Sequence, residues 1–144
     1  MRNDVARLIA FPLLAVVSGC VPAPSEPDIT VWSAQLTPAA GYPGLSGEAG
    51  AVSDLNGTDA TILIEGAEPG AVHTWHIRSG SCANPQERLG PASDYPDLQV
   101  GLQGSATADT RLGPRLNSAG TYHVEVQAGP DDASRITCGN LVRD

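Results

Sequence analysis

Short runs of alternating apolar and polar residues, divided by glycine and proline, constrain the fold of this chain most. No stretch of 12 residues carries a sustained helical apolar stripe that is free of Gly and Pro. Period-two alternation, which places every second side chain on one face of a strand, recurs instead. The chain contains 16 Gly and 12 Pro, a high share for a helical bundle. We predict strands over residues 29–36, 60–65, 72–79, 105–112 and 121–127.

Turn-forming sequences separate the predicted strands. Asn56-Gly57 is a tight-turn dipeptide, and Glu68-Pro69-Gly70 and Gly129-Pro130-Asp131-Asp132 also favour turns. Residues 83–97 (ANPQERLGPASDYPD) are predicted to form one long irregular loop. A chain of 144 residues with short, evenly spaced strands predicts a single all-β domain, an antiparallel sandwich or barrel.

The charge of the chain excludes one large class of partners. Its 8 basic residues are all Arg and stand against 16 Asp and Glu, which gives a formal net charge of −8. A nucleic-acid-binding protein needs a basic surface to neutralise phosphates, and this sequence offers none. We therefore expect no nucleic-acid partner.

The N-terminus reads as an export and anchoring signal. Arg2 and Arg7 flank the start of an apolar run over residues 8–17, which is too short to span a bilayer and fits a signal peptide. The run ends in Val17-Ser18-Gly19-Cys20, which resembles the bacterial lipobox. That resemblance implies cleavage before Cys20 and a diacylglycerol group on its thiol. The alternative is an ordinary signal peptide followed by an incidental cysteine.

These features divide the chain into three parts. Residues 1–19 are predicted to be a lipoprotein signal peptide, residues 20–28 a Pro-rich tether, and residues 29–144 the folded β domain. We expect a bacterial cell-envelope lipoprotein, periplasmic or surface-facing. The lipid anchor at Cys20 is expected to attach it to the membrane, which is its one expected partner. Multiple acyl chains give stable anchoring, since each buried methylene contributes about 0.8 kcal/mol.

The two remaining cysteines are Cys82 and Cys138. Outside the inner membrane the environment is oxidising, so a disulfide between them is expected. The alternative is a pair of free, buried thiols.

Two segments, residues 75–82 (WHIRSGSC) and 135–141 (RITCGNL), together resemble the Cu/Zn superoxide dismutase family. The resemblance implies a Greek-key β-sandwich or barrel. It places His76 at the first copper-ligand position, Arg78 where a second copper histidine stands, and Gln127 at a further copper ligand. It also implies a Cys82–Cys138 disulfide and a substrate-guiding position at Arg135. The loop that carries the zinc ligands in the family, residues 83–97 here, contains no His.

The metal motif is therefore broken at Arg78, because a guanidinium stays protonated and has no lone pair for a metal. We expect a salt bridge between Arg78 and Glu125 or another acid, with anion binding as the alternative. His76 is expected to be partly exposed with a hydrogen-bond partner, and His73 to face the opposite side of the strand. His123 is expected about 13 Å from the metal position, four residues from Gln127.

These observations predict no metal cofactor and no catalytic residue. The hypothesis is a lipid-anchored envelope protein whose superoxide dismutase-like β domain is a non-catalytic binding or structural module. The alternative is a degenerate copper-dependent dismutase or a copper-binding protein. The sequence identifies no particular protein or small-molecule partner.

Overall fold

The computed structural model describes residues 19–25 and 28–144 of the chain. The described chain is almost entirely strand: β1 (Thr30–Pro38), β2 (Ser46–Asp54), β3 (Gly57–Glu65), β4 (Val72–Ser81), β5 (Asn84–Arg88), β6 (Leu98–Gln99), β7 (Ala106–Leu112), β8 (Tyr122–Gly129) and β9 (Asp132–Arg143), with one short 3₁₀ turn, η1 (Ala92–Asp94). The all-β prediction is confirmed.

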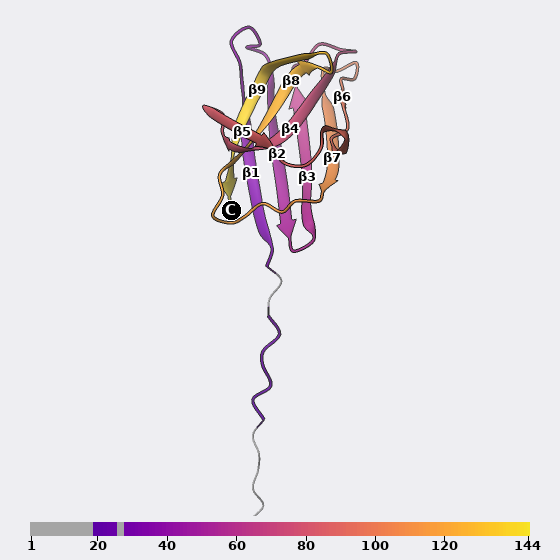
Figure 1. Cartoon of the computed structure of the whole chain (residues 1–144). Helices are drawn as coiled ribbons and strands as arrows, with labels where there is room; N and C mark the ends of the chain where they lie inside the picture. Colours follow the sequence, from indigo (N-terminus) through magenta and orange to yellow (C-terminus); the bar gives the residue numbers. More distant parts are fainter. Residues whose placement is uncertain (1–18, 26–27) are drawn as a thin grey trace, which may run out of the picture.

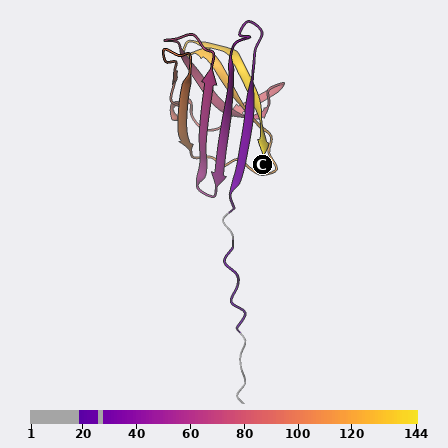
Figure 2. The same ribbon diagram turned by 180° about the vertical axis from the view of Figure 1, so that it is seen from behind.

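All strand pairs are antiparallel, and they form one sheet in the order β5-β4-β8-β9-β1-β2-β3-β7, with β6 paired to β4. The sheet curls on itself, so that its β5-β4-β8-β9 half faces its β1-β2-β3-β7 half (Figures 1 and 2). The neighbours β4–β8, β9–β1 and β3–β7 are far apart in the sequence, as in Greek-key barrels.

The five predicted strands correspond to β1, β3, β4, β7 and β8, with ends shifted by a few residues. The Asn56-Gly57 turn joins β2 to β3. β2 was not among the predicted strands, because its sequence SGEAGAVSD offers only small apolar residues, although Ala49 and Ala51 are buried. Backbone pairing along both edges, rather than apolar bulk, holds this strand between β1 and β3.

The prediction of a single irregular loop over residues 83–97 is wrong in part. Residues 84–88 form β5 on the edge of the sheet beside β4, and residues 92–94 form η1. The β5 sequence NPQER has no apolar alternation, because the strand is exposed and has only one neighbour. Gly80, with a φ of 83°, makes the bend that allows this pairing, since a Cβ there would collide with the carbonyl oxygen of Asn84.

The core lies between the two halves of the sheet, and the segment after β5 closes its open side. Trp75 and Ile77 of β4 are fully buried, as are Val124 and Val126 of β8. Trp75 donates its indole N–H to the carbonyl oxygen of Pro96 at 2.9 Å. Tyr95, Leu98 and Val100 are the buried side chains of this segment.

The two ends of the barrel carry different parts of the chain. β1 begins at the lower end in Figure 1, and the β1–β2 connection lies at the opposite end. Cys20 is exposed and forms no disulfide within the described chain, whereas the predicted signal peptide lies almost wholly outside the described residues. Among the residues described, none forms a helix long and apolar enough to cross a membrane.

We predict that Ile77→Ala lowers the free energy of unfolding by about 2–5 kcal/mol, because it leaves a cavity in a closed core. The control is Leu102→Ala, since Leu102 is 95% exposed and should change the stability by no more than about 0.5 kcal/mol. Denaturant unfolding measures both. Equal, small effects of the two substitutions would contradict the assigned core.

Candidate functional site

The region that the dismutase resemblance singles out centres on the carboxylate of Glu125. β8 lies between β4 and β9, and Glu125 pairs in register with His76 on one side and Cys138 on the other. Two positions further along β4 and β8, on the same face of the sheet, Arg78 pairs with His123. His76, Arg78, His123 and Glu125 therefore form a block of cross-strand neighbours on two adjacent strands, called the four-residue block below.

Two guanidinium groups bind the Glu125 carboxylate from opposite sides. Arg78 on β4 donates from Nε to Oε1 at 2.6 Å. Arg135 on β9 donates to Oε2 from Nη2 at 3.0 Å and from Nε at 3.3 Å. The Glu125 side chain is 6% exposed, whereas Arg78 and Arg135 are 24% and 29% exposed. The expected Arg78–Glu125 salt bridge is present, and Arg135 completes a three-strand ion-pair network.

Each arginine also holds a backbone carbonyl of the segment that follows β4. Arg78 donates from Nη1 to the oxygen of Gln86 at 3.1 Å, and Arg135 donates from Nη1 to the oxygen of Cys82 at 2.6 Å. The predicted Cys82–Cys138 disulfide is confirmed, and it joins the same segment to β9. The disulfide and the two arginines therefore hold the same segment, residues 82–86, against the sheet.

The electrostatics of this network favour the charged form of Glu125. Burial by itself would raise the pKa of this carboxyl. The hydrogen bonds and charges of Arg78, and then those of Arg135, outweigh burial and leave the pKa of Glu125 below its ordinary value. Two arginines and one carboxylate leave a net positive charge at the position where the dismutase resemblance places a copper ion.

His76 differs from the sequence expectation of a partly exposed, hydrogen-bonded histidine. It is only 8% exposed, and its Nδ1 has no hydrogen-bond partner among the described residues. Its ring packs edge-to-face on Tyr95, with ring centroids 5.1 Å apart. Burial, and then the charges of Arg88 and Arg78, lower the pKa of His76 to about 4. The imidazole is therefore neutral near pH 7.

His123 lies much nearer to the site than the sequence analysis places it. Its side chain is fully buried, and Nδ1 donates to the carbonyl oxygen of Gly80 at 3.1 Å. Nε2 points to Oε2 of Glu125 at 3.7 Å, which is too long for a hydrogen bond. The expected separation of about 13 Å was wrong because it was measured from Gln127, whereas the site centres on Glu125.

Gln127 lies opposite Thr74, two cross-strand pairs away from the pair of His76 and Glu125. Its side chain donates from Nε2 to Oε1 of Glu125 at 3.3 Å and accepts from the Thr74 hydroxyl at 3.2 Å. Gln127 therefore supports the carboxylate and does not stand directly opposite His76.

The contacts that Arg135, Arg88 and Tyr95 make at this site were not predicted from the sequence. Arg135 was identified only through the family resemblance, as a former substrate-guiding position, and the structure shows it bound to Glu125. Arg88 and Tyr95 lie in the segment expected to be an irregular loop. No periodicity marks Arg88 and Tyr95, because β5 is an exposed edge strand and Tyr95 lies outside the strands.

The donors available at the block do not fit the copper site of the family. Copper needs several imidazoles that converge on one point. Here the two imidazoles are separated by a carboxylate that two arginines already engage, and Arg78 carries a fixed positive charge. Within residues 19–25 and 28–144, no group of three or more His, Cys, Asp or Glu side chains is placed to hold a metal ion.

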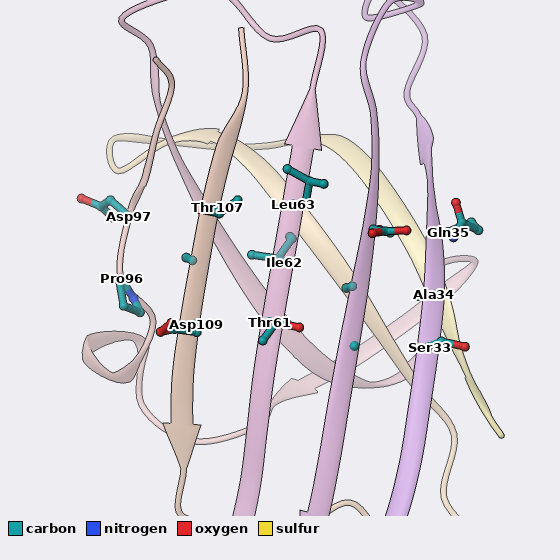
Figure 3. A pocket seen from close by; sticks show the side chains of 14 residues that line it. Ser33, Ala34, Gln35, Thr61, Ile62, Leu63, Pro96, Asp97, Thr107 and Asp109 are labelled. Carbon is teal, nitrogen blue, oxygen red and sulfur yellow. The ribbon is translucent and has the colours of Figure 1, made fainter. Parts of the chain in front are cut away.

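Two grooves lie on the outside of the barrel. One, of about 490 Å³, runs beside the disulfide and is lined by Arg135, Cys82 and Cys138. The other, of about 720 Å³, crosses β1, β2, β3 and β7, where Figure 3 shows polar side chains such as Gln35, Thr107 and Asp109. None of the described residues that the sequence analysis singled out lines this second groove.

Comparison with known proteins supports the fold. No family model matches the chain, and no curated protein matches it. Among solved structures, the chain is similar to a SOD-like protein from Bacillus subtilis, with a TM-score of 0.55 and 22% identity over 76% of this chain and 97% of that one. It is similarly close to a double mutant of a SOD-like protein from the same organism, in which a tyrosine and a proline are each replaced by histidine, with a TM-score of 0.54 and 22% identity over 76% and 96%. The chain therefore has a superoxide dismutase-like (SOD-like) fold.

The pKa of His76 predicts how stability depends on pH. The unfolded chain takes up a proton at this residue as the pH falls below 6.5, whereas the folded chain does so only near 4. The stability that neutral His76 provides is therefore complete above pH 6.5 and is lost progressively as the pH falls to about 4. We expect His76→Phe, which keeps a ring beside Tyr95 but cannot titrate, to lose less stability over that window. Thermal unfolding at a series of pH values tests this, and an equal loss in both proteins would refute it.

Proposed function

We propose that this protein is a lipid-anchored protein of the bacterial cell envelope whose SOD-like domain is a non-catalytic binding or structural module. The observation that carries the non-catalytic part is the pairing of Glu125 with Arg78 and Arg135. Protein charge stands at the position of the family's metal, so the domain keeps the fold and the disulfide without the chemistry of a dismutase. The lipobox-like sequence ending at Cys20 supports the anchor.

The alternative, copper binding, rests on two nitrogen atoms. Nδ1 of His76 and Nε2 of His123 are buried and have no hydrogen-bond partners in the described chain. Unpaired buried nitrogens of this kind cost free energy, and metal ligation would satisfy them. Against this, each copper ion would have to approach beside Arg78, whose charge repels it.

The metal content of the purified protein distinguishes the two functions. We expect no stoichiometric, tightly bound copper after copper loading and removal of the excess, and no dismutase activity in the loaded sample. Elemental analysis and a superoxide-consumption assay measure these quantities. One copper per chain together with dismutase activity would overturn the proposal and favour the enzyme.

A pair of substitutions tests whether Arg78 and Glu125 are what exclude copper. Arg78→His with Glu125→His turns the four-residue block into four imidazoles, so we expect copper affinity to rise by at least about tenfold over the wild-type chain. The matched control is Arg111→His with Asp59→His, which replaces an exposed ion pair on β7 and β3 and also adds two histidines. Equal copper affinity of the two variants would contradict the assigned role of the block.

Lipidation is tested at Cys20. In a bacterial host that processes lipoproteins, we expect the mature N-terminal peptide to begin at Cys20 and to carry acyl mass, as measured by mass spectrometry. Cys20→Ser should abolish that mass and release the protein from the membrane fraction, because an acidic domain has little attraction for anionic lipid of its own. An unmodified Cys20, or a mature chain that begins elsewhere, would refute the anchor.

A further inference from the structure

A third cavity has a volume of about 270 Å³. The connections that line it lie at the end of the barrel opposite the start of β1 (Figure 1). The cavity opens between the β1–β2 connection (residues 39–45) and the β3–β4 connection (residues 66–71). None of the residues of the four-residue block lines it. Whatever this cavity binds is therefore independent of the metal position and of the lipid anchor.

The walls of the cavity are mainly apolar and their backbone is held in place. Pro43, Leu45, Ala71 and Ile136 line it, and Leu45 and Ile136 are buried. The two connections touch at Gly66, whose φ is 75° and where a Cβ would collide with the carbonyl oxygen of Gly44. The cavity is therefore formed before any ligand arrives, which lowers the entropic cost of binding.

Three polar side chains line this cavity, those of Tyr42, Glu68 and His73, and of these only His73 is buried. The residue is 9% exposed, and its Nδ1 lies 2.8 Å from the carbonyl oxygen of Ala128. A carbonyl only accepts, so Nδ1 carries a proton, and in the Nδ1–H tautomer Nε2 is an acceptor. Nε2 makes no hydrogen bond with the part of the chain that the structure describes.

The structure assigns to this cavity the binding of a small, uncharged ring compound that has one hydrogen-bond donor, such as a phenol. The volume suits a single ring with small substituents. The apolar walls bury the ring, and the donor pairs with Nε2 of His73. Glu68 at the rim and the net charge of −8 disfavour an anionic ligand.

The test is a titration of the purified, ¹⁵N-labelled protein with phenol and with toluene, its counterpart without a donor, followed by amide chemical shifts. We expect saturable shifts in residues 41–45 and 66–71, with phenol bound about tenfold more tightly than toluene. No saturable shift in these residues, or equal affinity for the two compounds, would overturn the assignment.

Three variants identify the groups responsible. His73→Asn keeps an N–H donor near Ala128 but removes the Nε2 acceptor, so the preference for phenol over toluene should disappear. Ala71→Leu fills the cavity and should abolish binding of both compounds. The control, Leu55→Ala, changes a residue that is 70% exposed in the turn between β2 and β3 and should bind phenol as the wild type does. The amide spectrum shows whether each variant is folded, and an unchanged phenol preference in folded His73→Asn would refute the proposal.

Discussion

The charged carboxylate of Glu125 is the interaction on which the rest of this half of the barrel depends. It joins β4, β8 and β9 through Arg78 and Arg135, and Arg135 continues the connection to Cys82 and its disulfide. A buried carboxylate is costly unless cations and hydrogen-bond donors surround it. Removing one partner of such a group is costly for the same reason, about 3–5 kcal/mol where the pair is fully buried. The two arginines are therefore as much a part of the fold as the apolar core.

In the function proposed above, the same network is what separates the SOD-like fold of this chain from the chemistry of a dismutase. A metal site needs lone pairs directed at one point, whereas an ion-pair network needs donors directed at one carboxylate. At the four-residue block, His76 and His123 each have a ring nitrogen without a hydrogen-bond partner in the described chain. Arg78 instead donates to the carboxylate of Glu125. The fold and the disulfide are both present with an ion-pair network in place of a metal site, because neither depends on a bound ion.

Alternation along the strands predicted the all-β class, five of the nine strands in the described residues and part of the site. It placed His76 and Arg78 on one face, because side chains two residues apart share a face, and Glu125 was one of the acids expected to pair with Arg78. It did not predict β2, whose small side chains leave a weak apolar pattern, or the burial of His76. The burial of His76 depends on Tyr95, which arrives from a segment without periodicity. Register between strands distant in sequence also had to come from the structure, and it moved the centre of the site from Gln127 to Glu125.

The charge of Glu125 in the folded protein tests this account most directly. A carbon-detected NMR titration of its side-chain carboxyl measures the pKa in the intact protein. The account predicts a value below the 4.5 of an unperturbed glutamate, because Arg78 and Arg135 stabilise the anion more than burial destabilises it. The stability that Glu125 contributes would then be present above pH 4.5 and lost as the pH falls through the lower, folded value. A pKa at or above 4.5 would contradict the account, since the carboxylate would then not be held by two cations.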